Sequence, residues 1–82
     1  MNMKNITHSK LTSSLKKGAI AFTFVKINGQ KRKAYGTLNE NNMPKSLTMT
    51  EETIENNKST LYFDLDKAAW RSISKESVIY ID

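Results

Sequence analysis

The residues best suited to chemistry lie in one basic stretch near the middle of the chain. Residues 19–38, AIAFTFVKINGQKRKAYGTL, hold four cations and no acid. Lysine ammonium groups and the arginine fork bind phosphate oxygens, and an exposed aromatic ring beside them stacks on nucleobases. This combination predicts a surface that binds DNA or RNA. The candidate binding residues are Lys26, Lys31, Arg32, Lys33, Lys16, Lys17 and Tyr35.

The charge distribution along the chain supports this interpretation but leaves an alternative open. Residues 1–38 hold seven Lys, one Arg and no acid, whereas residues 39–82 hold five basic and eight acidic residues. An excess of cations favours partners that carry phosphate. The alternative is a solvated hairpin tip, whose lysines keep the chain soluble and discourage pairing at a sheet edge.

The other reactive residue types form no catalytic pattern. The chain has no cysteine, which excludes disulfides, thiolate zinc sites and a Cys nucleophile. Its one histidine, His8, lies in the first turn of a predicted helix, where we expect a solvated side chain. Asp64 and Asp66 flank a predicted turn, where Asp commonly makes local hydrogen bonds. We therefore predict that the protein is not an enzyme and needs no cofactor or metal.

The basic stretch must be positioned by a β-hairpin that turns at Asn28-Gly29. A two-residue type I′ turn requires positive φ at both central residues, which Asn and Gly tolerate best. That turn joins predicted strands over 19–27 and 30–38 and places Lys26 opposite Lys31 on one face. Gly36 then lies inside a strand, which indicates a bend or a close packing partner.

A short helix precedes the hairpin. We expect residues 1–6 to be frayed and residues 7–17 to be helical, because Leu11 and Leu15 give this segment one narrow apolar face. Gly18 is placed to be its left-handed stop. Such a short helix must dock on the rest of the fold by its leucines.

The second half of the chain predicts a long connection and three more strands. Within residues 39–58 we expect a turn over 39–44 and a helical turn over 50–56, started by a capping box at 48–51. A second hairpin follows, in which Arg71 pairs with Asp64 across the strands. A tight turn then leads to a last strand. The three predicted strands cover residues 59–65, 69–73 and 78–81.

These elements predict a mostly β fold. Five short, bent strands close most economically into a small SH3/Sm-like barrel, with the short N-terminal α-helix and the helical turn in the 39–58 loop added to it. We expect a single domain over residues 1–82, with the barrel in residues 19–81. Most aromatic rings then belong to the core, and the candidates for an exposed ring are Tyr35, Tyr62 and Trp70.

The chain shows no segment that could span a membrane. Its longest apolar run, residues 19–25, reaches only about a third of the roughly 20 residues required. Lys16 and Lys17 precede that run as they would in a signal peptide, but no small-residue cleavage site follows, so it reads better as a strand. We expect a cytoplasmic protein without membrane association.

Two stretches carry a family resemblance. LKKGAIAFTFVKINGQKRKAYGTL followed by YFDLDKAAWRSI resembles the WYL-like, Sm-type SH3 β-barrel proteins of bacteria and phages, a family of unknown function. The features that resemble it are Phe22-Thr23-Phe24 with Lys26, the Asn28-Gly29 turn, Arg32, Gly36-Thr37, Tyr62-Phe63-Asp64 and Trp70-Arg71. The resemblance implies the barrel and a kinship to WYL modules, which serve as ligand- or nucleic-acid-sensing parts of bacterial regulators. It supplies no active site.

We therefore predict a nucleic-acid-binding or regulatory module of a bacterium or phage. The alternative is a protein-interaction or assembly module, including a homo-oligomer, in which the strand over 78–81 extends a sheet into a partner. A small-ligand sensor is a third possibility that the sequence does not separate from the other two.

Overall fold

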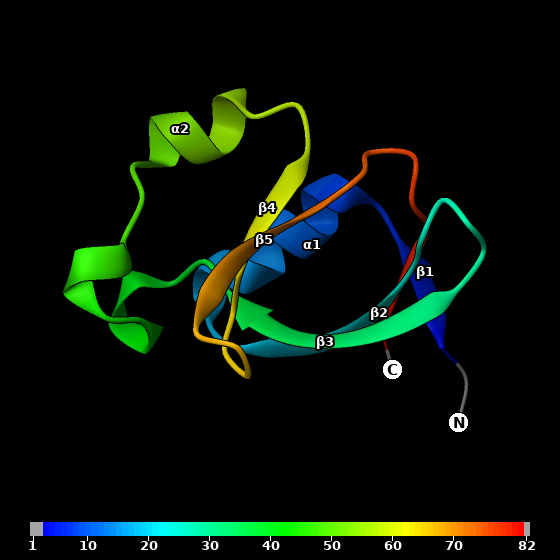
Figure 1. The fold of residues 1–82 in the computed structure, drawn as a ribbon, viewed down its shortest axis with the longest axis horizontal. Helices are drawn as coiled ribbons and strands as arrows, with labels where there is room; N and C mark the ends of the chain where they lie inside the picture. The colour runs from blue at the N-terminus through cyan, green and yellow to red at the C-terminus, as the bar shows by residue number, and fades with distance from the viewer. Residues whose placement is uncertain (1–2, 82) are drawn as a thin grey trace.

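The computed structural model describes residues 3–81, which form six antiparallel strands and two α-helices around one apolar core (Figure 1). The strands run in the sheet order β1-β6-β2-β3-β4-β5. The strands are β1 (Lys4–Ile6), β2 (Ile20–Val25), β3 (Lys31–Thr37), β4 (Thr60–Asp64), β5 (Ala69–Ile73) and β6 (Ile79–Ile81). The helices are α1 (His8–Lys17) and α2 (Glu51–Asn56), with short 3-10 helices η1 (Glu40–Asn42) and η2 (Lys45–Leu47) between β3 and α2.

The mostly β prediction is confirmed, but the prediction of a closed five-stranded barrel is wrong in strand number and closure. Residues 4–6, expected to be frayed, form β1 and pair with β6. The sheet is open, with β1 and β5 at its two edges. The extra strand arises because Ile6 packs against the core, so this segment gains apolar burial by pairing. Met1 and Asn2, also expected to be frayed, lie outside the described residues.

Helix α1 docks on the sheet by its two leucines, as predicted. Leu11 and Leu15 are fully buried, and Thr7 caps the helix by accepting a hydrogen bond from the backbone N–H of residue 10. The predicted left-handed stop at Gly18 is wrong, because its φ is 166°, an extended conformation. The end of β3 replaces that cap: the Thr37 hydroxyl lies 3.2 Å from the Leu15 carbonyl oxygen and 3.0 Å from that of Gly18.

His8 joins the start of α1 to the other end of the sheet. Its Nδ1 lies 2.7 Å from the Thr60 hydroxyl, and its Nε2 lies 2.7 Å from the Ser77 carbonyl oxygen. Because a carbonyl only accepts, the Nε2 atom carries a proton and donates it. The prediction of a solvated side chain is therefore wrong, and His8 serves as a structural tie.

The β2–β3 hairpin has a different turn and register from those predicted. The backbone N–H of Gly29 donates to the Lys26 carbonyl, and that of Lys26 donates to the Gln30 carbonyl, so the loop has three residues. Only Gly29 has positive φ, at 90°, whereas a type I′ turn requires positive φ at Asn28 as well. A three-residue loop places the strain on glycine alone. Lys26 therefore faces Gln30, and the predicted pairing of Lys26 with Lys31 is wrong.

The two hairpins are joined within the sheet at Gly36. This residue pairs with Ile20 on one side and with Asp64 on the other. A Cβ atom there would lie 2.5 Å from Cδ2 of Tyr62, whose ring packs edge-on against Phe22 at a centroid distance of 5.2 Å. The predicted close packing partner of Gly36 is thus the Tyr62 ring.

The 39–58 connection contains helical turns, as predicted, but its cap differs. Thr50, rather than Thr48, caps α2 by accepting a hydrogen bond from the backbone N–H of Thr53 at 3.2 Å. The two remaining turns are η1 and η2, which fill the predicted turn region and its continuation. The connection is fastened to β5 by Trp70, whose indole N–H donates to the Leu47 carbonyl at 2.6 Å.

The second hairpin and the last strand follow the predicted order, with one correction. Asp64 accepts hydrogen bonds from the backbone N–H groups of Asp66 and Lys67, and Ser77 N–H closes the predicted tight turn onto the Ser74 carbonyl. However, β6 lies between β1 and β2. The predicted use of this strand to extend a sheet into a partner is therefore wrong, because both of its edges are occupied. Within residues 3–81 no helix has the length and apolarity to cross a membrane.

Candidate nucleic-acid interface

The hairpin register divides the predicted cations between the two faces of the ribbon. Lys31, Lys33 and Tyr35 alternate along β3 on the outer face, whereas Arg32 shares the core face with its partner Phe24. Residues two apart on a strand lie about 6.8 Å apart on the same side. The outer row of Lys31, Lys33 and Tyr35 therefore presents two ammonium groups and one ring at a regular spacing.

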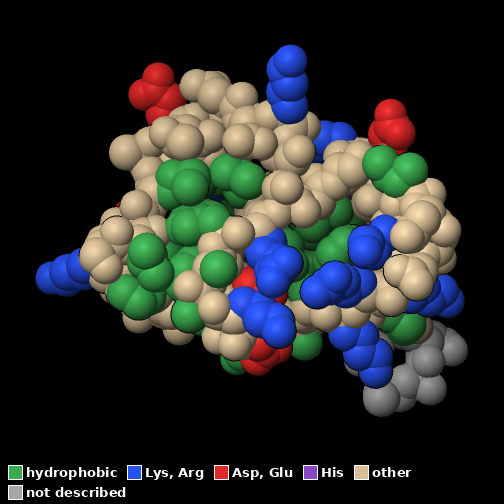
Figure 2. All heavy atoms as spheres, in the orientation of Figure 1, with side chains coloured by type: hydrophobic (Ala, Val, Ile, Leu, Met, Phe, Trp, Pro, Cys, Tyr) green, Lys and Arg blue, Asp and Glu red, His purple; other side chains and the backbone are tan. Residues whose placement is uncertain are grey.

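The outer row lies on a part of β3 whose backbone edge is not paired with another strand. Strand β4 pairs with β3 only at Gly36 and Thr37, so within residues 3–81 no strand covers the edge of Lys31 to Ala34. The Tyr35 side chain is 42% exposed. Figure 2 shows Lys and Arg side chains gathered over β3 and toward β5, with apolar side chains between them. The side chains of the outer row are therefore accessible from solvent.

These cations have no acidic neighbour in the described part of the chain. No Asp or Glu within residues 3–81 lies within 4.0 Å of the charged nitrogens of Lys26, Lys31, Arg32 or Lys33. An ammonium group already paired with a carboxylate would have to give up that contact to bind phosphate. The hairpin cations carry no such cost.

Arg32 shares the core face with a second arginine, Arg71. Arg71 lies opposite Tyr62 in the β4–β5 hairpin, and its Nε atom lies 3.4 Å from Oδ2 of Asp64, which confirms the predicted pair. Burial raises the pKa of the Tyr62 hydroxyl and the Asp64 carboxylate raises it further, while the Arg71 and Arg32 guanidinium groups oppose that shift. Both arginines therefore lie on the same side of the core, near the Tyr62 hydroxyl.

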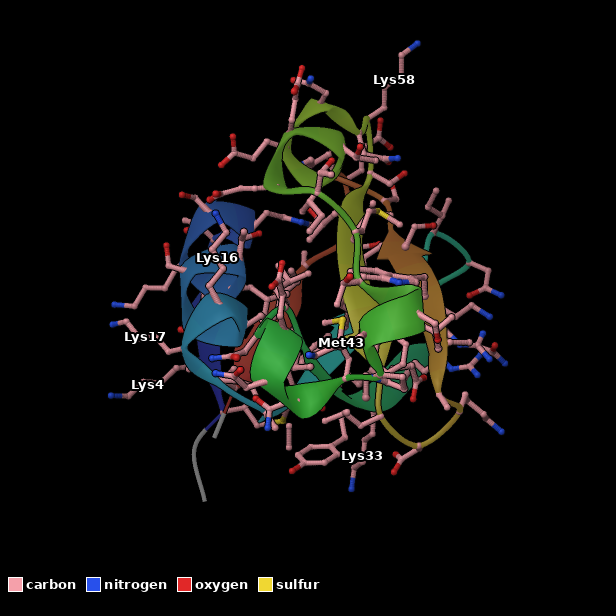
Figure 3. All side chains as sticks on the ribbon, turned by 90° about the vertical axis from the view of Figure 1, so that its left-hand side faces the viewer. Lys4, Lys16, Lys17, Lys33, Met43 and Lys58 are labelled. Carbon is pink, nitrogen blue, oxygen red and sulfur yellow. The ribbon has the colours of Figure 1, made fainter. Side chains whose placement is uncertain are left out.

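Lys16 and Lys17 are not brought to the hairpin. In Figure 3 they lie beside α1, on a different side of the molecule from Lys33. The Nζ atom of Lys16 lies 2.9 Å from a Glu51 oxygen and 3.4 Å from a Glu55 oxygen, and the hydrogen bond to Glu51 raises the pKa of Lys16. This lysine ties α1 to α2. Lys17 is exposed at the end of α1.

Of the three candidate rings, the structure leaves Tyr35 exposed. Tyr62 is 2% exposed and belongs to the core, while Trp70 is half-buried and packs edge-on against Phe63 at a centroid distance of 5.7 Å. A further ring, Tyr80, comes next to the outer row because β6 pairs with β2 at Thr23. No local pattern in the sequence indicates this neighbour, since it depends on the order of the strands.

Tyr80 and Lys33 line the same hollow on the outer face. The hollow has a volume of about 480 Å³, and its floor is formed by β2 and β3. Thr23 stands between them, opposite both Lys33 and Tyr80 in the two strand pairings. The outer row is therefore bordered by a second aromatic ring, the kind of group on which bases stack in single-strand binders.

The comparisons with known proteins agree with the architecture. Residues 8–79 match the family model described as WYL_2, Sm-like SH3 beta-barrel fold. No curated protein and no solved structure matches the chain significantly. The match covers α1, both hairpins and the start of β6, and therefore includes every residue of the outer row.

Proposed function

This chain belongs to the WYL_2 family of Sm-like SH3 β-barrel folds, and we propose that it is a non-enzymatic module that binds single-stranded nucleic acid. Sm-like folds often bind nucleic acid or oligomerise. The resemblance to WYL modules favours a regulatory role in a bacterium or phage.

One observation carries the proposal: the outer row of Lys31, Lys33 and Tyr35 stands on a strand edge that no other described strand covers. Phosphates of an extended strand meet the two ammonium groups, while a base stacks on the Tyr35 ring. The backbone N–H groups of Lys31 and Lys33, which point away from β2, add further donors along this edge for phosphate or base oxygens. A single strand fits this row better than a duplex, since only unstacked bases can reach a ring.

The test is a titration with labelled single-stranded and duplex oligonucleotides at about 50 and 200 mM salt. We expect single-strand binding that weakens steeply with salt, because bound phosphates release counterions. In the double variant Lys31→Glu, Lys33→Glu, affinity at the lower salt should fall at least about tenfold. The slope of log affinity against log salt should become shallower by roughly 1.4, which corresponds to two lost phosphate contacts.

The control is Lys58→Glu, compared with the single variant Lys33→Glu: each changes the charge by two units, and Lys58 lies on the far side of the molecule from Lys33 (Figure 3). A general electrostatic attraction would weaken to a similar degree at either place. If both variants lose affinity equally, or if the double variant binds as the wild type does, the outer row is not the binding surface. Thermal unfolding of each variant verifies that the fold is intact.

A protein-interaction module remains the second candidate because β5 is an edge strand. Ala69–Ile73 pairs only with β4 among the described strands, so its other edge can accept a further strand. We expect light scattering at increasing concentration to show a dimer or larger species if this edge pairs between copies. A constant monomer mass at high concentration excludes self-association and leaves only a different protein as partner.

A further inference from the structure

A groove lies on the core face of the first hairpin, opposite to the face that carries the outer row. It runs between the β2–β3 tip and the turn that joins β5 to β6, two segments that lie close together in Figure 1. The backbone N–H of Val25 donates to the Val78 carbonyl at 2.9 Å, which holds the groove's two walls together at one end. Its volume is about 460 Å³.

The floor and lip of the groove are apolar. Phe24 and Ile73 form the floor and are 8% and 1% exposed, so their positions are set by the core. Ile27 stands at the lip on the hairpin tip and is 78% exposed. An exposed isoleucine at a turn position gains nothing from the fold, and it can cover a planar group that enters the groove.

Polar groups that suit a nucleobase edge surround this floor. Three serines and one asparagine line the groove, and their hydroxyl and amide groups both donate and accept hydrogen bonds. These residues are Asn28, Ser72, Ser74 and Ser77.

The one charged residue among the described residues that line the groove is a lysine, Lys26. Arg32 lies directly opposite the floor residue Phe24 in the strand pairing. Arg71 lies on the same face of β5 as Ile73, two positions earlier. Among the residues that line the groove there is no Asp or Glu. The site thus combines an apolar slot with cations at its border, which matches an aromatic ring that carries a phosphate.

We propose that this groove binds one unpaired nucleobase of a single strand whose flanking phosphates contact Arg32 and Lys26. The inference rests on the proposed function and adds a second subsite to it. Arg32 lies between Lys31 and Lys33 on β3, so a strand held by the outer row reaches the groove by crossing the uncovered edge of β3. One base then stacks on Tyr35 outside, and a base further along the same strand enters the groove inside.

Methyl and amide NMR with two probes tests the subsite. The probes are a twelve-residue oligothymidylate and an abasic strand of the same length, which carries the same phosphates without bases. We expect the oligothymidylate to shift the methyl signals of Ile27 and Ile73, and the abasic strand to leave them unchanged. Both probes should shift the backbone amides of Lys31 and Lys33, and the methyl of Ile54 in α2 serves as an internal control.

A matched pair of variants adds an affinity measurement. Ile27→Ser removes the lip at an exposed turn position, and Leu47→Ser makes a similar change at a side chain that is 39% exposed in η2. Ile27→Ser should weaken binding of the oligothymidylate about fivefold and leave binding of the abasic strand unchanged, because only a base buries the isoleucine. Leu47→Ser should change neither affinity.

The possible failures are distinguishable. Equal amide shifts from both probes, with unmoved Ile27 and Ile73 methyls, overturn the subsite and leave the proposed function standing. If neither probe shifts any signal, both proposals are wrong. Methyl shifts that appear with an acidic peptide, but with neither oligonucleotide, also overturn both and assign the groove to a protein partner.

Discussion

Both hairpins of this protein are antiparallel strand pairs that carry polar side chains. These side chains contact the rest of the fold in one hairpin and not in the other. In β4–β5, the Asp64 carboxylate accepts two backbone hydrogen bonds and pairs with Arg71, and Trp70 packs on Phe63. In β2–β3, the Lys31 and Lys33 side chains make no ion pair with any described residue. Polar groups that already satisfy the fold are not available to a ligand. The polar groups of the second hairpin therefore stabilise the fold, whereas those of the first are free for the ligand that we propose.

The largest effect is expected where the two hairpins meet. A Cβ atom added by Gly36→Ala would lie 2.5 Å from Cδ2 of Tyr62 and 2.9 Å from the Phe63 carbonyl oxygen. Because a backbone atom and a buried ring cannot both move away easily, the variant should lose at least about 2 kcal/mol of unfolding free energy. Urea denaturation measures this loss. Gly18→Ala is the control: its added Cβ would have no neighbouring side chain or backbone atom within 4 Å among the described residues, so a comparable loss there would contradict the packing argument.

The next effect tests the structural role of the second hairpin. Asp64→Ala removes the acceptor of the Asp66 and Lys67 backbone N–H groups and the partner of Arg71. Since Asp64 is only 8% exposed, we expect a loss of about 2 kcal/mol in chemical denaturation. The control Asp66→Ala changes an exposed carboxylate in the same turn and should cost little. Equal losses would mean that the turn, rather than the Asp64 contacts, sets the stability.

Alkaline pH provides a third comparison through Tyr62, because burial raises the pKa of its hydroxyl above the ordinary value of 10.0. The folded state thus favours the neutral phenol. Its contribution to stability is complete below pH 10 and is lost as the pH rises through the folded-state pKa. Tyr62→Phe should make the unfolding free energy fall less steeply with pH above 10. Parallel pH profiles for the wild type and the variant would contradict this role.

The smallest effect concerns the turns themselves. The first hairpin places Gly29 at φ 90°, whereas the second places Ala68 at φ 51°, a left-handed conformation that disfavours a side chain. Ala68→Gly should therefore raise the melting temperature, with a gain of about 0.5–1 kcal/mol. Gly29→Ala should lower stability by a similar amount. A loss from Ala68→Gly would show that the Ala68 side chain makes a contact worth more than the strain.

Much of the fold could be predicted from local sequence patterns. The helix over 7–17, the two hairpins and the Arg71–Asp64 pair each depend on residues that are near in the chain. Apart from the turn of the first hairpin, errors occurred where a long-range contact replaced a local feature. The predicted stop at Gly18 became unnecessary because Thr37 contacts the end of α1, and His8 contacts Thr60 and Ser77 from the far end of the chain.

The sequence indicated which residues belong to the candidate site, but it did not indicate how they are arranged. The four cations and Tyr35 stand out in the sequence because no acid lies among them. Which side chains lie next to one another depends on whether the hairpin loop has two or three residues. A change of one residue shifts the register, so that each side chain faces a different partner across the strands. Neither Tyr80 beside Lys33 nor Ser77 beside Phe24 in the groove can be inferred from spacing along the chain.

The sequence by itself determined the family, the mostly β class and the identity of the basic residues, because periodicity, turn residues and charge are local properties. Tertiary structure decided which cations face which way, which aromatic ring stays exposed and where an apolar groove forms beside them. The physical reason is that strand order and register follow from the burial of the whole core. That burial places β6 between β1 and β2 and leaves the edge of β3 open.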